Sequence, residues 1–303
     1  MREIGILGLG RMGLGIGRRL MRKGWRVMGY DPSEEARRRA QESGIETFGD
    51  LEFLCGEFSG ERVFWIMVPH TAVDEVLSSL KPYLLEGDII IDGGNSNYRD
   101  SVRRAEELRK IGVRFLDVGV SGGVWGEEEG YCLMIGGDEE VFRRVEGLFK
   151  DLAYGGDGYA YLGRSGAGHF VKMVHNGIEY GMMQAIAEGF ELMKESEFDL
   201  DLREVARVFR RGSVIRSWLM DLTEKALKDF GDLEGVAPYV EDSGEGRWTV
   251  QTAVELGVPL WVIAGSLFTR FRSRQEVSFR DRLLAALRFE FGRHPVKRKD
   301  GQG

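Results

Sequence analysis

The sequence is poor in cysteine and in positive charge. Its 303 residues include only two cysteines, Cys55 and Cys132, which lie in apolar surroundings and lack metal-ligand spacing. Neither a disulfide framework nor a metal site is therefore predicted, and a reducing cytoplasm is the expected compartment. The 42 basic residues are outnumbered by 49 acidic ones, for a formal net charge of -7. A nucleic-acid partner, which requires a basic face, is not expected.

Apolar runs long enough to cross a membrane are also missing. The longest, around Leu260–Phe268, is well short of the roughly 18 residues that a span requires. No leader pattern precedes the first predicted strand, which begins by Glu3. We therefore expect a soluble protein, and its 43% apolar residues are enough to bury a full core.

Up to about residue 162, short β-branched or aliphatic runs alternate with longer charged, amphipathic segments. Such alternation is typical of βαβ units on a parallel sheet. The predicted strands are Ile4–Leu7, Trp25–Tyr30, Val63–Val68, Asp88–Asp92 and Val113–Val118, with Cys132–Ile135 and Tyr159–Leu162 as added edge strands around a helix at Glu139–Leu152. We expect a doubly wound sheet of seven or eight strands.

Beyond Gly168, apolar residues recur at spacings of three and four while glycine, proline and strand-like runs thin out. That spacing predicts helices, the first over about Ala167–Ser196. The expected fold class is α/β: a Rossmann-type domain over residues 1–164, followed by an all-α domain over residues 165–303.

A glycine-rich turn, Gly8–Gly13, follows the first strand and opens a helix predicted over Met12–Lys23. In a dinucleotide-binding fingerprint, such glycines allow a tight turn, close backbone approach to the pyrophosphate, and close packing of helix on strand. The predicted cofactor contacts are Gly8, Leu9, Gly10, Arg11, Met12 and Gly13, with Val68 at the end of the third strand.

Asp31 ends the second strand about 20 residues after the glycines, where a carboxylate accepts hydrogen bonds from the adenosine ribose hydroxyls. A carboxylate there repels a 2′-phosphate, and Pro32 offers no cation to bind one. Arg37–Arg39 lie nearby, but their place within the next helix favours a solvated face. NAD is therefore the expected cofactor, in preference to NADP.

Two later loops follow strands at the carboxyl edge of the sheet, where open α/β folds bind ligands. Polar residues crowd the first, Asn95–Asn97, and favour a ligand loop over a plain turn. The second, Ser121–Gly123, could form a carboxylate-binding nest from its backbone amides and the serine hydroxyl.

The segment Gly166–Tyr180 carries a polar stripe. On a helix, Lys172, His175, Asn176 and Glu179 lie at i, i+3, i+4 and i+7 and share one face. A solvated ion pair between Lys172 and Glu179 is the alternative, but the apolar flanking residues indicate a mostly buried helix. Because burial shifts the pKa values of amines and carboxyls toward neutrality, the two make a candidate acid/base pair.

Three later segments, Gly244–Thr249, Phe268–Arg270 and Arg288–His294, each place a cation among glycines or aromatic residues. Taken alone, each resembles a surface arginine more than a ligand-binding group.

Together and in this order, the motifs GLGRMG, DGGNSNYRDS, GVSGG, GAGHFVKMVHNGIEYGMMQ, GRWT and FGRH resemble the decarboxylating 6-phosphogluconate dehydrogenases over almost the whole chain. The resemblance implies that Lys172 is the general base and Glu179 the acid. It implies a sugar-phosphate site lined by Asn95, Ser121, Gly122, Gly123, His175, Asn176, Tyr180, Arg247, Arg270, Arg288 and His294, with Asn95 also touching the cofactor. In that family, the last two come from the neighbouring subunit.

Four departures from the family pattern stand out. Asp31–Ser33 replaces the usual Asn-Arg-Thr that recognises the NADP phosphate, which agrees with NAD. Arg247 replaces a usual lysine, and the loop Val124–Gly130 is unlike the usual sequence. The chain also has one copy of a helical domain that is commonly duplicated, so we expect residues 165–303 to mediate formation of a homodimer or homotetramer.

The expected reaction is therefore NAD-dependent oxidative decarboxylation of 6-phosphogluconate to ribulose 5-phosphate and carbon dioxide, without a metal. A dehydrogenase of another small β-hydroxyacid, of the 3-hydroxyisobutyrate type, is the first alternative. A non-catalytic NAD-binding or redox-sensing protein is the second, although it would not require both Lys172 and Glu179.

Overall fold

The computed structural model describes residues 2–293 and 295–297. The chain divides into two compact units, Met1–Gly177 and Ile178–Gly303, and helix α8 (Ala167–Lys194) contributes to both. The domain boundary predicted between residues 164 and 165 remains a prediction. Within the described residues, no helix combines the length and the apolar character that a membrane span requires.

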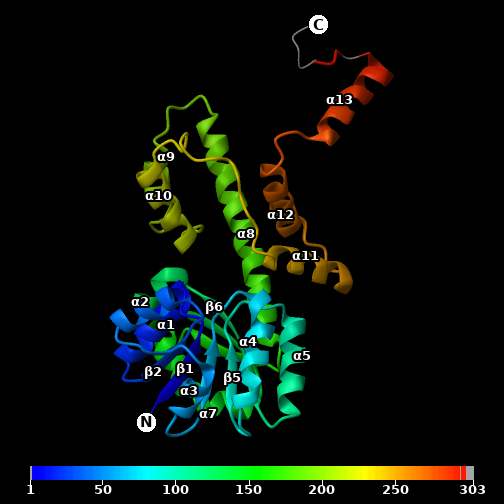
Figure 1. Ribbon diagram of the computed structural model, residues 1–303. Coiled ribbons are helices and arrows are strands. Elements are labelled where there is room, and N and C mark those ends of the chain that lie inside the picture. Colours follow the sequence, from blue (N-terminus) through cyan, green and yellow to red (C-terminus); the bar gives the residue numbers. More distant parts are fainter. Residues whose placement is uncertain (1, 294, 298–303) are drawn as a thin grey trace. The chain divides into compact units, whose positions relative to one another are not determined.

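The first unit is built on one eight-stranded sheet (Figure 1). Its strands lie in the order β3-β2-β1-β4-β5-β6-β7-β8, and every adjacent pair is parallel except β6 and β7. They span β1 Glu3–Leu7, β2 Arg26–Tyr30, β3 Glu46–Phe48, β4 Val63–Ile66, β5 Ile89–Asp92, β6 Arg114–Ser121, β7 Cys132–Gly137 and β8 Tyr159–Gly163. The predicted doubly wound α/β architecture is confirmed.

Two details of the predicted sheet were wrong. The strand around Cys132–Ile135 is not at an edge, because β7 lies between β6 and β8. The second edge is instead β3, which the sequence did not reveal because a strand of three residues is too short to show alternation.

Helices cover both faces of the sheet and bury two separate cores (Figure 1). On one face, apolar residues of α1, α2 and α7 pack around Ile6 and Trp65. On the other, those of α3, α4 and α5 pack around Phe64 and Ile90. The helices of this unit besides α8 are α1 Arg11–Arg22, α2 Glu34–Glu42, α3 Leu51–Gly56, α4 Val73–Leu80, α5 Tyr98–Arg109, α6 Gly126–Glu129 and α7 Glu139–Leu152.

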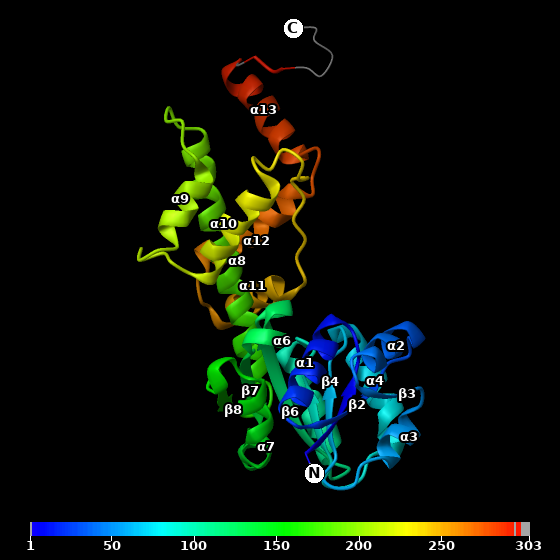
Figure 2. The same ribbon diagram turned by 90° about the vertical axis from the view of Figure 1, so that its left-hand side faces the viewer.

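The second unit consists of helices, as expected. After α8 come α9 Leu202–Phe209, α10 Trp218–Phe230, α11 Glu245–Leu256, α12 Trp261–Ser273 and α13 Phe279–Gly292. Helices α9 and α10 pack side by side, and the Ser217 hydroxyl caps α10 by accepting a hydrogen bond from the backbone N–H of Met220 (Figure 2).

Candidate functional site

The turn between β1 and α1 has the geometry that a dinucleotide requires. Gly8 has φ of 102°, a value that favours glycine. A side chain at Gly13 would collide with the Gly8 carbonyl, so the helix can pack directly on the turn. At Gly10, by contrast, the position that a Cβ would take is open space as far as the described residues are concerned. The residues present therefore fit a pyrophosphate approaching the start of α1.

Asp31, at the end of β2, is held against this turn. One carboxylate oxygen accepts a hydrogen bond from the Leu9 backbone N–H at 2.8 Å, and the other accepts one from Ser33 at 2.9 Å. The Leu9 side chain is buried in the core, so Leu9 can meet a ligand only through its backbone. Arg37 does not lie simply on a solvated face, because its guanidinium donates to the backbone carbonyls of Asp31 and Pro32.

The Asn95 loop joins β5 to α5, and its three polar residues have different roles. Ser96 is buried and donates to Asp92 at 2.7 Å. The Asn97 side chain caps α5 by accepting from the Arg99 backbone N–H at 3.0 Å. Asn95 has φ of 53°, and its side-chain oxygen is buried without a hydrogen-bond partner in the described part of the chain. Of the three, Asn95 is the one whose side-chain oxygen lacks a hydrogen-bond partner among the described residues.

Val68 lies just beyond β4, between the glycine turn and the Asn95 loop. Its side chain is 2.7 Å from the Cβ position of Gly8, and its carbonyl is 2.6 Å from that of Gly94. Substituents on either glycine would therefore collide with Val68. The two loops approach the same residue at the carboxyl edge of the sheet.

Ser121 ends β6 and faces the first turns of α8. Its hydroxyl lies 3.4 Å from His175 Nε2, and His175 Nδ1 lies 3.2 Å from the Asn176 side-chain oxygen. Gly122 and Gly123 both have positive φ, at 121° and 53°. The structure thus brings together Ser121, His175 and Asn176.

Lys172 is buried at 6% exposure, against the middle of β6. A side chain at Gly119 would overlap Lys172 Cβ, so the missing side chain lets α8 approach the strand. Asp117, in the same strand, anchors the start of α8 by accepting hydrogen bonds from the backbone N–H groups of Gly166 at 2.7 Å and His169 at 2.9 Å. These hydrogen bonds hold the first turn of α8 against β6.

The part of α8 that precedes Tyr180 is mostly buried, as its apolar residues indicated, and Met173 is 2% exposed. Lys172 and Asn176 are buried, whereas Val171 and Ile178 are 37% and 51% exposed. The prediction of a mostly buried helix therefore fails at Val171 and Ile178, which the described part of the chain leaves exposed.

In the second unit, Tyr180 and Arg270 lie close together. The Arg270 guanidinium carbon lies 3.5 Å from the centre of the Tyr180 ring, and Arg270 also donates to the Glu241 carbonyl. Cation–π contact fixes the guanidinium while leaving charge available for an anion. Glu179, the residue before Tyr180, is half-buried on the same helix.

Arg247 lies in a second cationic group that the sequence only partly predicted. It donates to both carboxylate oxygens of Asp242, at 2.7 and 3.1 Å, and Arg274 binds the same carboxylate at 2.5 Å. Hydrogen bonding to these arginines lowers the pKa of Asp242 to about 2. Since one carboxylate faces two guanidinium groups, the cluster retains net positive charge.

The C-terminal predictions are only partly described. Arg288 is exposed on α13, while His294 lies outside the described residues. No described contact places Arg288 near the residues of the other helices.

Several supporting residues were missed in the sequence, namely Asp92, Arg104, Asp117, His169, Asp242 and Arg274. Asp117 had a usable signal, because it interrupts an apolar strand. The sequence signal for Arg104 was its helical spacing, which places it with Ser101 and Leu108 on the buried face of α5.

A Rossmann-type sheet with this glycine turn, joined to a helix that carries a buried lysine, defines a dinucleotide-dependent dehydrogenase. The family profile described as the NAD binding domain of 6-phosphogluconate dehydrogenase matches residues 3–163. The profile for the C-terminal domain of 6-phosphogluconate dehydrogenase matches residues 168–288. The chain belongs to the 6-phosphogluconate dehydrogenase family.

Relatives support this assignment along the whole chain. The NAD(+)-dependent, decarboxylating 6-phosphogluconate dehydrogenase of Haloferax volcanii is 44% identical over 300 residues, which cover 98% of this chain and 99% of that protein. Plasmodium falciparum 6-phosphogluconate dehydrogenase, described in its apo form and with NADP+ or 6-phosphogluconate, aligns with a TM-score of 0.82 at 28% identity. That alignment covers 99% of this chain and 67% of that one.

The fold is also shared with a different dehydrogenase. The 3-hydroxyisobutyrate dehydrogenase of Salmonella typhimurium has a TM-score of 0.72 at 22% identity, covering 88% of this chain and 92% of that chain. At that identity the likeness concerns the fold alone.

Proposed function

We propose that the protein oxidises and decarboxylates 6-phosphogluconate to ribulose 5-phosphate and carbon dioxide, with NAD as the hydride acceptor. The observation that carries this proposal is the buried Lys172 on α8, on a helical face that it shares with His175, Asn176 and Glu179. Burial favours an uncharged amine, which can accept a proton.

In the proposed mechanism, Lys172 accepts the proton of the substrate 3-hydroxyl as C3 is oxidised. The bound nicotinamide supplies the hydride acceptor. The Lys172 ammonium then polarises the new carbonyl while the substrate's C1 carboxylate leaves as carbon dioxide. Glu179 protonates C1 of the resulting five-carbon enediol, the carbon that was C2 of the substrate. Asn95, Ser121, Gly122, Gly123, His175 and Asn176 bind and orient the sugar chain.

The substrate phosphate is assigned to Tyr180, Arg247 and Arg270. Arginine forks suit a phosphate dianion, and Tyr180 holds Arg270 by its ring. The ion pair with Asp242 keeps Arg247 oriented before substrate arrives. These cations supply the positive charge that an acidic protein needs locally to bind this substrate.

The preference for NAD is assigned to Asp31 and Pro32. Changing Asp31→Asn together with Pro32→Arg should lower the ratio of kcat/KM for NAD to that for NADP by about 100-fold. The double change weakens the hydrogen bonds that the Asp31 carboxylate makes to the ribose of NAD, and it removes the repulsion between that carboxylate and the 2′-phosphate of NADP. Each effect is worth about 1–3 kcal/mol, and the new arginine adds a cation for the phosphate. Initial rates with each cofactor measure this ratio.

Arg38→Ala is a control for this cofactor test, because Arg38 is exposed on α2 and forms an ion pair with Glu42. It should leave the ratio within about twofold of the parent, as expected for a solvent-screened surface charge that is already paired with Glu42. A double variant that prefers NAD as strongly as the parent would show that Asp31 is not the selector.

The predicted homodimer or homotetramer remains part of the proposal, with Arg288 and His294 completing the partner's site. Exposed apolar side chains on α12 support it, among them Trp261 at 85% and Val262 at 67%. An apolar surface of this kind is usually covered by a partner.

The substrate assignment is tested by following reduction of NAD and NADP in parallel with 6-phosphogluconate, gluconate and 3-hydroxyisobutyrate. Rapid NAD reduction with 6-phosphogluconate alone is expected, because the unphosphorylated acids cannot use the arginines. Equal rates with 3-hydroxyisobutyrate would favour the alternative β-hydroxyacid dehydrogenase. Binding of NAD without turnover of any acid would favour a non-catalytic protein.

A further inference from the structure

The buried face of α5 is polar where an amphipathic helix is normally apolar. Ser101 is 0% exposed and Arg104 is 2% exposed, and with Leu108 they form the inward-facing row of the helix. An arginine is almost never fully buried unless it is paired, since removing its charge from water is costly. The contacts of Ser101 and Arg104 therefore require an explanation beyond core packing.

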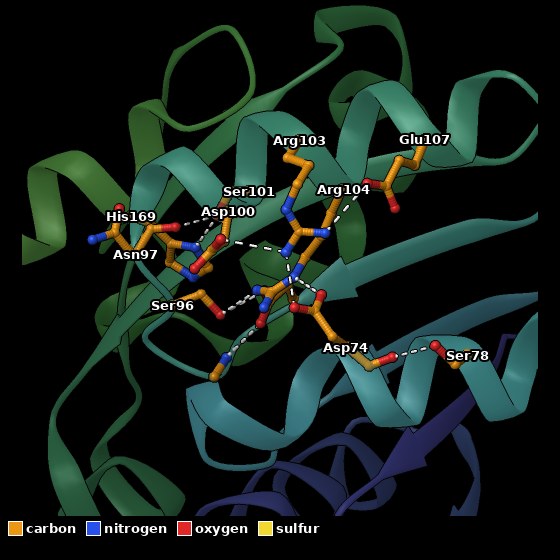
Figure 3. A network of polar contacts seen from close by, with 12 residues as sticks. Asp74, Ser78, Ser96, Asn97, Asp100, Ser101, Arg103, Arg104, Glu107 and His169 are labelled. Atoms are coloured by element: carbon orange, nitrogen blue, oxygen red, sulfur yellow. Dashed lines mark hydrogen bonds and ion pairs between the residues drawn. The ribbon is translucent and has the colours of Figure 1, made fainter.

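Arg104 joins α5 to the loop that carries Asn95 (Figure 3). Its guanidinium donates to Ser96 Oγ at 2.8 Å, to Asp92 Oδ2 at 3.0 Å and to Asp74 Oδ1 at 2.7 Å. The other Asp92 oxygen accepts from the Gly94 backbone N–H at 3.0 Å. Both neighbours of Asn95, Gly94 and Ser96, are thus hydrogen-bonded to the buried Arg104–Asp92 ion pair. These contacts hold Asn95 in its positive-φ conformation.

Ser101 joins the same helix to α8. Its hydroxyl lies 2.7 Å from His169 Nδ1, and Figure 3 shows the two side chains facing each other. His169 is 1% exposed and its Nε2 has no hydrogen-bond partner in the described residues, so the contact with Ser101 is the one that fixes the ring. His169 precedes Lys172 by three residues, about one helical turn.

We propose that Ser101 and Arg104 are positioning residues. Through them, α5 rigidly connects the Asn95 loop to α8, the helix that carries Lys172. Asn95 and Lys172 act on the substrate from different elements, so their separation depends on what connects those elements. The buried contacts of α5 provide that connection, through Arg104 on one side and the Ser101–His169 pair on the other. A misplacement of about 1 Å at a reacting group can cost about 100-fold in rate.

The structure offers matched variants for a test. Arg104→Met should lower kcat with 6-phosphogluconate by about 100-fold, and Ser101→Ala by about tenfold. The first removes the contact of α5 with the Asn95 loop, and the second removes its contact with α8. Arg103→Met is the control, since Arg103 lies on the same helix but forms exposed ion pairs with Asp74, Asp100 and Glu107. It should change kcat by less than about twofold, as expected for exposed pairs.

His169 provides a second comparison of similar side chains. His169→Asn keeps a polar atom near the position of Nδ1 and should retain most of kcat, whereas His169→Gln moves the amide outward and should behave like Ser101→Ala. A purely structural role would not distinguish them in this way. NADH binding, followed by its fluorescence, should change far less than kcat in all variants, because Asp31 and the glycine turn are untouched and Asn95 is only one of the predicted cofactor contacts.

Because the proposal rests on the proposed function, the parent enzyme is assayed first. A parent that does not turn over 6-phosphogluconate contradicts the function itself. With an active parent, unchanged kcat in both Ser101→Ala and His169→Gln would overturn the proposed positioning role of α5. Equal losses of kcat in His169→Asn and His169→Gln would overturn it as well. These variants decide the matter even if Arg104→Met fails to fold.

Discussion

Lys172→Met should abolish turnover of 6-phosphogluconate while leaving cofactor binding intact. The loss in kcat should be about 10⁴-fold, because in the proposed mechanism the lysine is both the base during oxidation and the cation that polarises the carbonyl during decarboxylation. Methionine has a similar length and no charge, so it fits the buried site beside Gly119. Steady-state rates and NADH fluorescence titration measure the two effects separately.

Lys194→Met is the matched control for this variant. Lys194 lies in the last turn of α8 and is exposed, so the same substitution on the same helix should leave kcat unchanged. Near-normal turnover in Lys172→Met, with the parent active, would remove the lysine from the mechanism.

Glu179→Gln should lower kcat by about 100- to 1000-fold, the range expected when a general acid is removed. Glutamine keeps the shape of the side chain but lacks the acidic proton that C1 of the enediol needs. Protonation should then limit the rate, so the solvent deuterium isotope effect on kcat should rise above that of the parent.

Glu188→Gln provides the control for the acid. Glu188 is exposed on α8 and accepts a hydrogen bond from Gln184, so its loss should affect neither kcat nor the isotope effect. If Glu179→Gln turns over like the parent, or slows without a larger isotope effect, another group protonates C1.

The sequence predicted the fold well where the hydrophobic pattern was long. The alternation of strands and helices gave the parallel sheet, and the change of spacing after Gly168 gave the helical unit. It failed for β3, where three residues cannot show a period, and for β7, because strand order depends on pairing with β6 and β8. Pairing between strands is a tertiary property that local patterns do not contain.

The candidate site was predicted from residue types at strand ends, and those types are ambiguous. Asn95, Ser96 and Asn97 look alike in sequence, but Ser96 packs on Asp92 and Asn97 caps α5. The exposed apolar face of α8 was missed because helical spacing shows which residues share a face, and tertiary contacts decide which face is covered. The role of Arg104 could not be predicted, because its partners come from two other elements.

The most direct test of the proposed function is the stoichiometry of the products. With 6-phosphogluconate and NAD, the protein should release one carbon dioxide and one ribulose 5-phosphate for each NADH formed. This ratio should hold throughout the reaction, because oxidation and decarboxylation occur at one site. Formation of NADH without carbon dioxide, or no NADH at all, would contradict the assignment of an oxidative decarboxylase.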